Sequence, residues 1–512
     1  MVISDNKVLV IGLDGATFDL IMPWIKEGKL PTISNMITNG VYGELTSTIP
    51  MFTPTAWSSF ITGKNPGKHG VMGFFSRNKY NYTLSLNTFQ RRGKTIWDIL
   101  GEAGKRVIII NVPTTYPPNH VNGLIISGML TPPNSKNFTY PLSLQKEIDD
   151  IVGGYKIYPS VNYDDKNEDI FISDIYDVTI KQGKIAEYLI QKYPWDFFMV
   201  VLNGTDLLQH GLWKYIDSKH PDFYKEKEKK YNDIFLEYYK LIDNIICRLS
   251  NKVGNNTLKI IVSDHGFGPL YKFIHINQWL LRLKFMNVKT KPLSLLRFFL
   301  FRLGITPNNV YNLLIKIKLY TLRTRLGRNK GHKFMSKFFF SFSDIDWNRT
   351  IAYSLGSMGQ IHLNIKNREP HGIITRKTEY NYYKNKIIDN LNILRDPDSK
   401  NLVIDKIYLK EEIYDGKYYD ELPDIIFLPK KGYIGFEEFE FASNNVFTKA
   451  QGISGTHRLN GILIIECKTF IKKGIKLDYS PNIYDVFPTI IKFMNIPFDS
   501  DVDGIPILKA FN

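Results

Sequence analysis

The sequence predicts an α/β fold: a layered sandwich with a mostly parallel central sheet, helices on both faces and a helical insertion. Short apolar runs rich in β-branched residues alternate along the chain with longer amphipathic runs of helical spacing. Several short runs end directly before a polar residue, as buried parallel strands do where they reach a site. Of the 512 residues, 43% are hydrophobic and 23% are charged, which is typical of a folded globular protein.

The expected strands and helices follow from these runs in chain order. Strands are expected at 7–13, 106–111, 196–202, 258–263, 424–428 and 461–465. Helices are expected at 95–103, 175–192, 225–250 and 482–493. Residues 113–140 are rich in Pro, Gly, Ser, Thr and Asn, so this stretch is expected to form loops that cross the site edge.

One segment carries most of the net charge of +16. Between Asn287 and Ser343 there are twelve Lys and Arg residues and no Asp or Glu. Leu293 to Leu303 and Tyr311 to Leu319 suggest two basic helices with apolar faces. We therefore expect three regions: a first part of the α/β core at 1–286, a basic helical insertion at 287–343 and a second part of the core at 344–512.

The role of this insertion stays open at the level of sequence. It could be a cap on the core with solvated charges, a lid over an anionic substrate, or an element that contacts an anionic membrane surface. Cys247 and Cys467 each lie in a largely apolar run, and so few cysteines fit a reducing compartment. The N-terminus has no signal-peptide pattern and no stretch reaches 18 uninterrupted apolar residues. We expect a cytoplasmic protein without a spanning helix, with peripheral membrane contact as the open alternative.

Acid and histidine residues recur where the expected strands end. Asp206 and His210 are four residues apart on a predicted helical turn, which places both side chains on one face. Asp264 and His265 are adjacent and directly follow the strand at 258–263. Each has an ordinary reading as a cap or a surface residue, but together at strand ends they indicate metal ligands.

Two further residues complete this pattern. Asp14 follows the first strand, and His457 lies in the glycine-rich stretch Gly452 to His457, before the strand at 461–465. The carboxyl ends of parallel strands meet at one edge of a sheet, where sites in α/β proteins form. We therefore expect Asp14 and His457 to lie near the two acid–histidine pairs.

The stretch from Ile49 to Gly70 has the pattern of a nucleophile loop that leads into a helix. Thr53 precedes Pro54, which favours the first turn of a helix, and Gly63 ends the apolar run. A threonine at a helix start has its oxygen near free backbone N–H groups, where negative charge is stabilised. Taken alone, a threonine in this position is more often a simple N-cap than a nucleophile, and only the other motifs of the chain favour the second interpretation.

With these motifs in order, the sequence resembles the alkaline phosphatase superfamily, in its type I phosphodiesterase and nucleotide pyrophosphatase-like branch. The resemblance covers roughly residues 5–285 and 344–505. Its carriers are Gly12-Leu13-Asp14-Gly15, the run from Thr53 to Gly70, Asp206-Leu207-Leu208-Gln209-His210, Ser263-Asp264-His265-Gly266 and Gly455-Thr456-His457.

The resemblance implies an alkaline phosphatase-like fold that holds two divalent metal ions, usually zinc and sometimes manganese. Carried over residue by residue, one ion is held by Asp206, His210 and His457. The other is held by Asp14, Asp264, His265 and the Thr53 oxygen. It also implies hydrolysis of phosphate esters, and of diesters by the branch, through attack of Thr53 on phosphorus and a phosphothreonine-type intermediate.

The sequence departs from the branch at one position and leaves several activities open. Nucleotide pyrophosphatases have an asparagine shortly after the nucleophile, whereas Thr55, Ala56 and Trp57 follow here, so the resemblance does not extend to nucleotide specificity. A sulfatase needs a Cys/Ser-x-Pro-x-Arg context that is missing here. Alternatives are a phosphomonoesterase, a phosphotransferase or mutase, and a non-catalytic membrane- or polyanion-binding protein. Nucleic acid is not an expected partner, and His69 is expected to order its loop.

Overall fold

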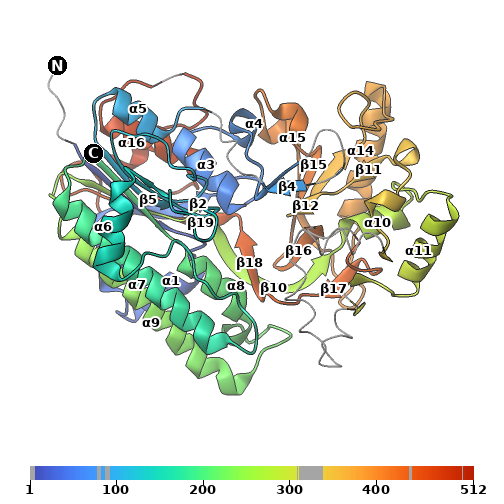
Figure 1. Cartoon of the computed structure of the whole chain (residues 1–512), viewed down its shortest axis with the longest axis horizontal. Coiled ribbons are helices and arrows are strands. Elements are labelled where there is room, and N and C mark those ends of the chain that lie inside the picture. Colours follow the sequence, from blue (N-terminus) through green and yellow to red (C-terminus); the bar gives the residue numbers. More distant parts are fainter. Residues whose placement is uncertain are drawn as a thin grey trace.

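The computed structural model describes residues 6–77, 82, 84–86, 93–307, 309–310, 338–437, 441–498 and 500–511. The described chain forms a larger lobe around a long twisted sheet and a smaller lobe beside it (Figure 1). The carboxyl ends of the central strands in the larger lobe point toward the smaller lobe, so the site edge lies between them.

The central sheet of the described residues is mostly parallel, as the sequence predicts. In spatial order the strands are β20 (Ile475–Lys476), β2 (Val41–Thr46), β19 (Asn460–Glu466), β9 (Leu258–Val262), β1 (Val8–Leu13), β8 (Phe197–Leu202), β5 (Val107–Val112), β6 (Gly123–Ser127) and β7 (Thr139–Tyr140). The strands β9, β1, β8, β5 and β6 run parallel to one another, β19 is antiparallel to β9 and β2, and β7 is antiparallel to β6.

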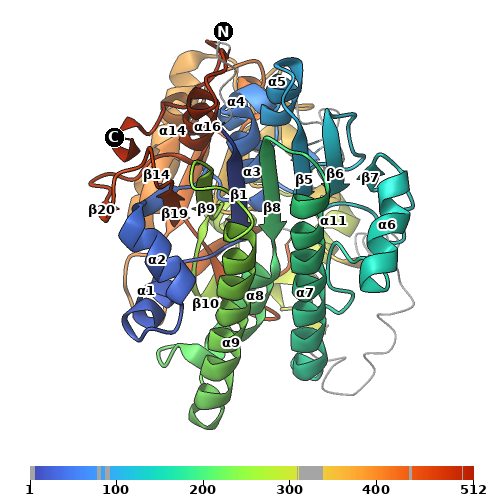
Figure 2. The same cartoon turned by 90° about the vertical axis from the view of Figure 1, so that its left-hand side faces the viewer.

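Helices cover both faces of this sheet because its strands are apolar on both sides. Leu9 and Ile11 of β1 enter one core, whereas Val8 and Val10 enter the other. The first core is covered by α1 (Phe18–Lys26), α2 (Pro31–Asn39), α6 (Ser143–Val152), α7 (Glu168–Lys192), α8 (Gly204–Ile216) and α9 (Lys225–Ser250) (Figure 2). The second core is covered by α3 (Thr53–Thr62), α5 (Ile96–Glu102) and α16 (Val486–Phe493).

Most expected elements of the larger lobe are present within a few residues of their predicted bounds. The expectation of loops at 113–140 is wrong in part, because β6 and β7 lie there and extend the central sheet. The apolar core of β6 is only Leu124, Ile125 and Ile126, and turn-forming residues on both sides hide so short a run. The expected strand at 424–428 exists as β15 (Ile425–Pro429) but pairs in a separate antiparallel sheet.

The smaller lobe has its own apolar core and largely antiparallel sheets. One sheet contains β11 (Ala352–Tyr353), β13 (Gln360–Leu363), β15 and β14 (Ile404–Leu409). The other contains β12 (Gly356–Ser357), β16 (Gly432–Glu437), β10 (Gly266–Ile274), β17 (Phe447–Lys449) and β18 (Gly455–Arg458). Helices α10 (Ile276–Arg282) and α14 (Lys377–Asn392) pack against this core.

Apart from the helix in the basic segment 287–343, the remaining described elements are short. They are β3 (Phe75–Arg77) and β4 (Leu84–Leu86), which pair with each other, α4 (Pro66–His69), α15 (Lys410–Ile413) and the 3-10 turns Phe342–Asp344, Trp347–Arg349, Tyr419–Glu421, Ile483–Asp485 and Leu508–Ala510. The last but one of these turns leads directly into α16.

Strand β10 joins the two lobes. Its first residues pair with β18, and its last residues pair with β16 and β17. Phe267 stands opposite His457 in the β10–β18 pair, and β10 begins directly after His265. The pairing therefore brings two histidines that are distant in sequence to the same place.

The basic segment 287–343 is described only at its ends. Its first predicted helix is present as α11 (Pro292–Arg302), whereas its second, at 311–319, lies outside the described residues. A bridge between Val288 and Ile345 closes the base of the segment. The division of the chain at 287 and 343 stays a prediction. Among the helices in the described ranges, none is long and apolar enough to cross a membrane.

Candidate metal centre

Three carboxylates meet at the carboxyl edge of the central sheet. Asp14 follows β1, Asp264 follows β9, and Asp206 lies in the first turn of α8, directly after β8. These three strands are neighbours, with β1 in the middle. Asp14 and Asp264 are fully buried and Asp206 is nearly so. Charged carboxylates are not placed together in a protein interior without a compensating cation.

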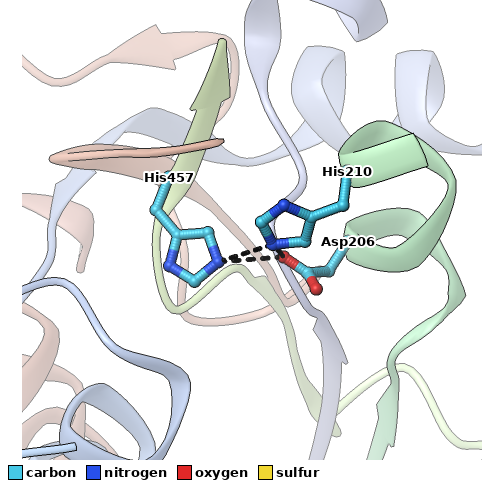
Figure 3. A group of neighbouring side chains, drawn as sticks. All are labelled: Asp206, His210 and His457. Atoms are coloured by element: carbon cyan, nitrogen blue, oxygen red, sulfur yellow. Dashed lines mark hydrogen bonds and ion pairs between the residues drawn. The ribbon is translucent and has the colours of Figure 1, made fainter. Parts of the chain in front are cut away.

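The first cluster contains Asp206, His210 and His457 (Figure 3). The Asp206 Oδ1 atom lies 3.4 Å from Nε2 of His210 and 3.3 Å from Nε2 of His457. The two Nε2 atoms lie 3.0 Å apart. The i, i+4 spacing on α8 places His210 above Asp206, and β18 brings His457 to face them.

The ring orientations in this cluster are set by backbone carbonyls. Nδ1 of His210 lies 2.9 Å from the Gly455 carbonyl oxygen, and Nδ1 of His457 lies 2.8 Å from that of Met51. A carbonyl can only accept, so each Nδ1 carries a proton, and the neutral form of each ring then presents an Nε2 lone pair to the site. Two lone pairs and a carboxylate oxygen then face one point, which is the arrangement of donor atoms around a metal ion.

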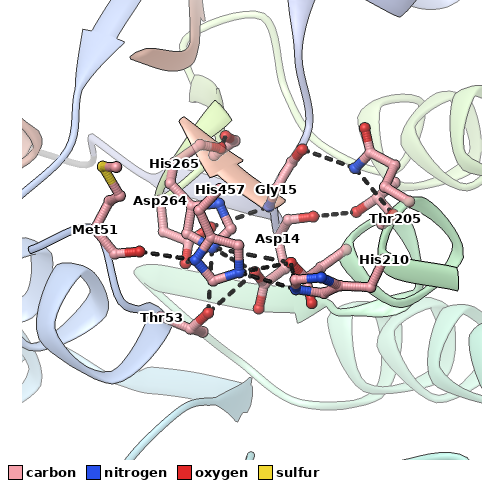
Figure 4. A network of polar contacts seen from close by, with 12 residues as sticks. Asp14, Gly15, Met51, Thr53, Thr205, His210, Asp264, His265 and His457 are labelled. Atoms are coloured by element: carbon pink, nitrogen blue, oxygen red, sulfur yellow. Dashed lines mark hydrogen bonds and ion pairs between the residues drawn. The ribbon is translucent and has the colours of Figure 1, made fainter. Parts of the chain in front are cut away.

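The second cluster is built around His265 (Figure 4). Its Nδ1 lies 3.0 Å from the Gly266 carbonyl oxygen, so its Nε2 also faces the site as a lone pair. This Nε2 lies 3.5 Å from Asp14 Oδ1, 3.4 Å from Asp264 Oδ2 and 3.3 Å from Thr53 Oγ1. The Thr53 oxygen is also 3.5 Å from Asp14 Oδ1. The structure therefore brings the predicted second set together with the predicted nucleophile.

Asp206 lies between the two clusters, which the sequence did not indicate. Its Oδ1 is 4.0 Å from Nε2 of His265, and Asp14, Asp206 and His265 also form a compact group of possible ligand atoms. The rings of His265 and His457 stack, with centroids 3.6 Å apart. The two candidate sites are thus adjacent and share a wall. No short-range sequence pattern predicts that the two sites are adjacent, because their distance depends on how strands far apart in the chain pair.

Unpaired polar atoms test whether this site suits a metal ion. Oδ1 of Asp206 and Oδ2 of Asp264 are buried, and within the described ranges neither has a hydrogen-bond donor. An unpaired buried carboxylate oxygen is costly unless a cation neutralises it. Together with the imidazole lone pairs, these oxygens fit divalent metal ions such as zinc.

The pKa values of the clustered side chains also indicate a site for a cation. Burial, followed by the charges of Asp264 and Asp206, raises the pKa of Asp14 well above its usual range. Burial raises the pKa of Asp264 to about 7. Burial and His457 lower the pKa of His265 well below its ordinary value. Burial alone would raise the pKa of Asp206, but a proton at Nε2 of His210 and of His457 would hold it well below its usual range.

Polar residues of β8 and α8 support the ligands. Nδ2 of Asn203 donates to Asp14 Oδ2 at 2.8 Å, and the Thr205 hydroxyl donates to the Asp14 carbonyl oxygen. Nε2 of Gln209 donates to the carbonyl oxygen of Gly15 at 2.8 Å. Sequence reasoning missed these roles. Their position between the strand end and His210 was the available signal, because ligand carboxylates need donors that fix their orientation.

The nucleophile candidate lies at the start of a buried helix. Thr53 is the first residue of α3, Pro54 occupies the first turn, and Gly63 in the left-handed conformation ends the helix. Near the C-terminal end of α3, Ser59 Oγ lies 2.8 Å from Nε2 of His69. Nδ1 of His69 accepts a hydrogen bond from the Val71 amide at 3.1 Å. His69 therefore ties the loop after α3 to the helix, as the sequence analysis expected.

Comparison with known proteins identifies the family. A model of the type I phosphodiesterase / nucleotide pyrophosphatase family matches residues 8–457 of the chain. This range includes every predicted ligand and Thr53. A comparison with curated protein sequences gives no significant match.

Three of the solved structures that share the fold come from different enzymes. Human ectonucleotide pyrophosphatase/phosphodiesterase 5 aligns with a TM-score of 0.53 at 13% identity, over 99% of this chain and 100% of that one. Phosphonoacetate hydrolase from Sinorhizobium meliloti 1021 aligns with a TM-score of 0.53 at 14% identity, over 96% of each chain. A mutant of alkaline phosphatase PafA aligns with a TM-score of 0.51 at 14% identity, over 99% of each chain. At these identities the likeness establishes the fold.

The family match and the shared fold confirm the resemblance that the motifs indicate. The α/β fold class is confirmed as well. The chain shares its fold with alkaline phosphatase PafA, and it belongs to the type I phosphodiesterase / nucleotide pyrophosphatase family of enzymes.

Proposed function

We propose that the protein hydrolyses phosphodiesters with Thr53 as nucleophile and two divalent metal ions, zinc or alternatively manganese, as cofactors. The observation that carries this proposal is the position of Thr53 Oγ1, 3.3 Å from His265 Nε2 and 3.5 Å from Asp14 Oδ1. A threonine that only capped its helix would direct its oxygen at the helix amides. Here the oxygen lies at the convergence of the second cluster.

The two ions would be held by the two clusters of the structure. Asp206, His210 and His457 would hold one, and Asp14, Asp264, His265 and the Thr53 oxygen the other. Bound divalent cations at such a site lower the pKa of the nucleophile and neutralise charge on the phosphate and the leaving oxygen. Imidazole with carboxylate is a common zinc set, which favours zinc over manganese.

The chain's own residues then account for the covalent steps. Thr53 Oγ forms a bond to phosphorus while the bond from phosphorus to the leaving oxygen breaks, and the leaving alcohol takes up a proton. Water then attacks the phosphothreonine, the bond from phosphorus to Oγ breaks, and the Thr53 hydroxyl is restored. The free N–H groups in the first turn of α3, which Pro54 does not supply, would stabilise negative charge on the phosphate, because the first N–H groups of a helix have no partner within it.

The preference for diesters rests on the family, which is that of the type I phosphodiesterases. The first experiment compares bis(p-nitrophenyl) phosphate with p-nitrophenyl phosphate as substrates, with added zinc or manganese. We expect a higher kcat/KM for the diester. A higher kcat/KM for the monoester would reject the diesterase assignment and leave the metal site untouched.

The second experiment tests the nucleophile. Thr53→Ala should lower kcat by several orders of magnitude and leave the second cluster's histidine and carboxylates able to bind metal. Thr53→Ser should keep part of the activity, and Thr62→Val, at the far end of the same helix, should keep nearly all of it. Rapid quench and mass spectrometry should find a phosphate on Thr53. Near-normal turnover in Thr53→Ala would remove Thr53 from the mechanism.

A further inference from the structure

We propose that the outer face of helix α11 docks on an anionic membrane surface. This inference concerns a part of the chain outside the metal centre and does not rest on the proposed function. It rests on how α11 is anchored, on the apolar stripe that this anchoring leaves outside, and on the charges beside the stripe.

The inner face of α11 is fixed by specific contacts. Phe301 is only 1% exposed, and its ring packs 5.1 Å from that of Phe340. Ser294 Oγ donates to Asp344 Oδ1 at 2.8 Å, and Arg297 Nη1 pairs with the same oxygen at 3.2 Å. Residues 294, 297 and 301 follow helical spacing and lie on one side. These contacts fix the rotation of the helix about its axis.

The opposite side of α11 is an exposed apolar stripe. Leu293, Leu296, Phe299 and Leu303 are each between 53% and 64% exposed, although they are among the most apolar residues of the segment. Their spacing of three, three and four residues places them on one face, directed away from Asp344. Leu295 and Ile305 extend the exposed apolar surface. A contiguous apolar patch of this kind usually marks an interaction site.

Charge indicates which partner the stripe would meet. Lys291 precedes the helix, Arg302 ends it, and both residues are exposed. No acid occurs in the sequence from 287 to 343, where twelve residues are basic. An apolar helix face bordered by Lys and Arg without acids is the pattern of helices that lie in the interface of anionic lipid bilayers.

The position of α11 is compatible with contact to a flat surface. Figure 1 shows it at the end of the longest axis of the molecule, in the smaller lobe, away from the central sheet. A bilayer can therefore reach the stripe without displacing the larger lobe. The occupant we infer is the headgroup region of a membrane that contains anionic lipids, with Leu and Phe side chains at the acyl boundary.

Co-sedimentation of the full-length chain with vesicles tests this inference. We expect binding to vesicles of phosphatidylcholine and phosphatidylserine at 3:1, and much weaker binding to phosphatidylcholine alone. The double variant Leu296→Ser/Phe299→Ser and the double variant Lys291→Glu/Arg302→Glu should each bind the mixed vesicles about tenfold more weakly or worse. The matched control is Leu142→Ser/Ile170→Ser, at two apolar residues of the larger lobe that are 64% and 63% exposed; it should bind as the unchanged protein does.

The possible contrary results separate this inference from the proposed function. Equal pelleting of the unchanged protein and Leu296→Ser/Phe299→Ser would overturn it, and so would equal binding to neutral and anionic vesicles. A dimer in sedimentation velocity that this variant dissociates, without vesicle binding, would assign the stripe to a second copy instead. Hydrolysis of a small soluble diester should be unchanged in all these variants, whereas Thr53→Ala should bind vesicles normally.

Discussion

Nε2 of His210 and Nε2 of His457 lie 3.0 Å apart, although 247 positions separate the two residues in the sequence. Both rings hold their Nδ1 proton on a backbone carbonyl, so the two lone pairs repel each other unless a cation lies between them. The short distance between the two nitrogens therefore suits a metal ion bound between the rings. It leads to separate predictions for each cluster.

Replacing His457 should empty one site and leave the other. His457→Ala removes one of the three donors of the first cluster, so we expect metal content to fall from about two ions per chain to about one, with a large loss of kcat. Inductively coupled plasma mass spectrometry on dialysed protein measures the content. His120→Ala, at an exposed histidine that packs against Tyr140, is the control and should retain both ions. Full metal content in His457→Ala would contradict the assignment of this cluster.

Metal affinity should rise with pH. The raised pKa values of Asp14 and Asp264 mean that a proton competes with the metal ion below about pH 7. His265 does not compete, because its pKa is lowered and its ring is already neutral. From pH 8 to pH 6, the protonation of Asp264 alone should weaken binding about tenfold. Competition with a calibrated chelating dye measures this, and equal affinities at the two values would show that neither carboxyl retains its proton in the metal-free protein.

Asn203 should tune the second cluster without binding metal itself. Its amide donates to Asp14 Oδ2, so Asn203→Ala leaves Asp14 free to rotate away from the site. Partners of ligand carboxylates typically contribute 10–100-fold in metal affinity or activity, and we expect a loss of about that size. Excess metal should restore part of the lost activity in Asn203→Ala, whereas it should restore no activity in Thr53→Ala. An unchanged affinity would mean that Asp14 is held by its surroundings alone.

The smaller lobe should depend on one buried ion pair. Nη1 of Arg368 bonds Asp424 Oδ1 at 2.7 Å, and Nη2 bonds Oδ2 at 2.5 Å. Burial alone would raise the pKa of Asp424, but Arg368 holds it well below its usual range. Arg368→Met leaves a buried carboxylate with weaker compensation, so we expect a loss of about 3–5 kcal/mol in stability at pH 8.

The pH dependence of this variant checks the cause. A carboxyl with a depressed folded-state pKa contributes stability above its unfolded pKa and loses that contribution as the pH falls through the folded value. Without Arg368 the pKa of Asp424 rises, so the carboxyl accepts a proton at moderate pH and the deficit shrinks. The difference in Tm between Arg368→Met and the unchanged protein should thus be smaller at pH 5 than at pH 8. Arg395→Met, at an exposed arginine, should show almost no difference at either pH.

The sequence predicted the central sheet and the residues of the site because both depend on local patterns. Asp14 and Asp264 stand directly after apolar runs and Asp206 follows one four positions later, and parallel strands carry such positions to one edge. The spacing of Asp206 and His210 encodes their common helix face. The expected ligands and Thr53 meet at that edge in the structure, although their individual roles stay predictions.

What the sequence did not predict depends on pairing over long distances. The smaller lobe uses strands as short as β11 and β12, which leave almost no periodic signal. The position of Asp206 between both clusters follows from the pairing of β10 with β18, which joins residues far apart in the chain. Similarly, the link between Asn203 and Asp14 is visible only once β8 and β1 lie side by side.

The bond from His457 Nδ1 to the Met51 carbonyl closes a loop of 406 positions. Almost all of the smaller lobe lies within that loop. The pairing of β10 with β18 brings the end of the loop back to the central sheet. Contacts of such long sequence separation form late in folding, because the entropy of closing the loop must be overcome first. We therefore expect most of the central sheet to form before His457 is in place. The candidate ligands would then come together as a complete set only late in folding, so a partly folded chain would present an incomplete site.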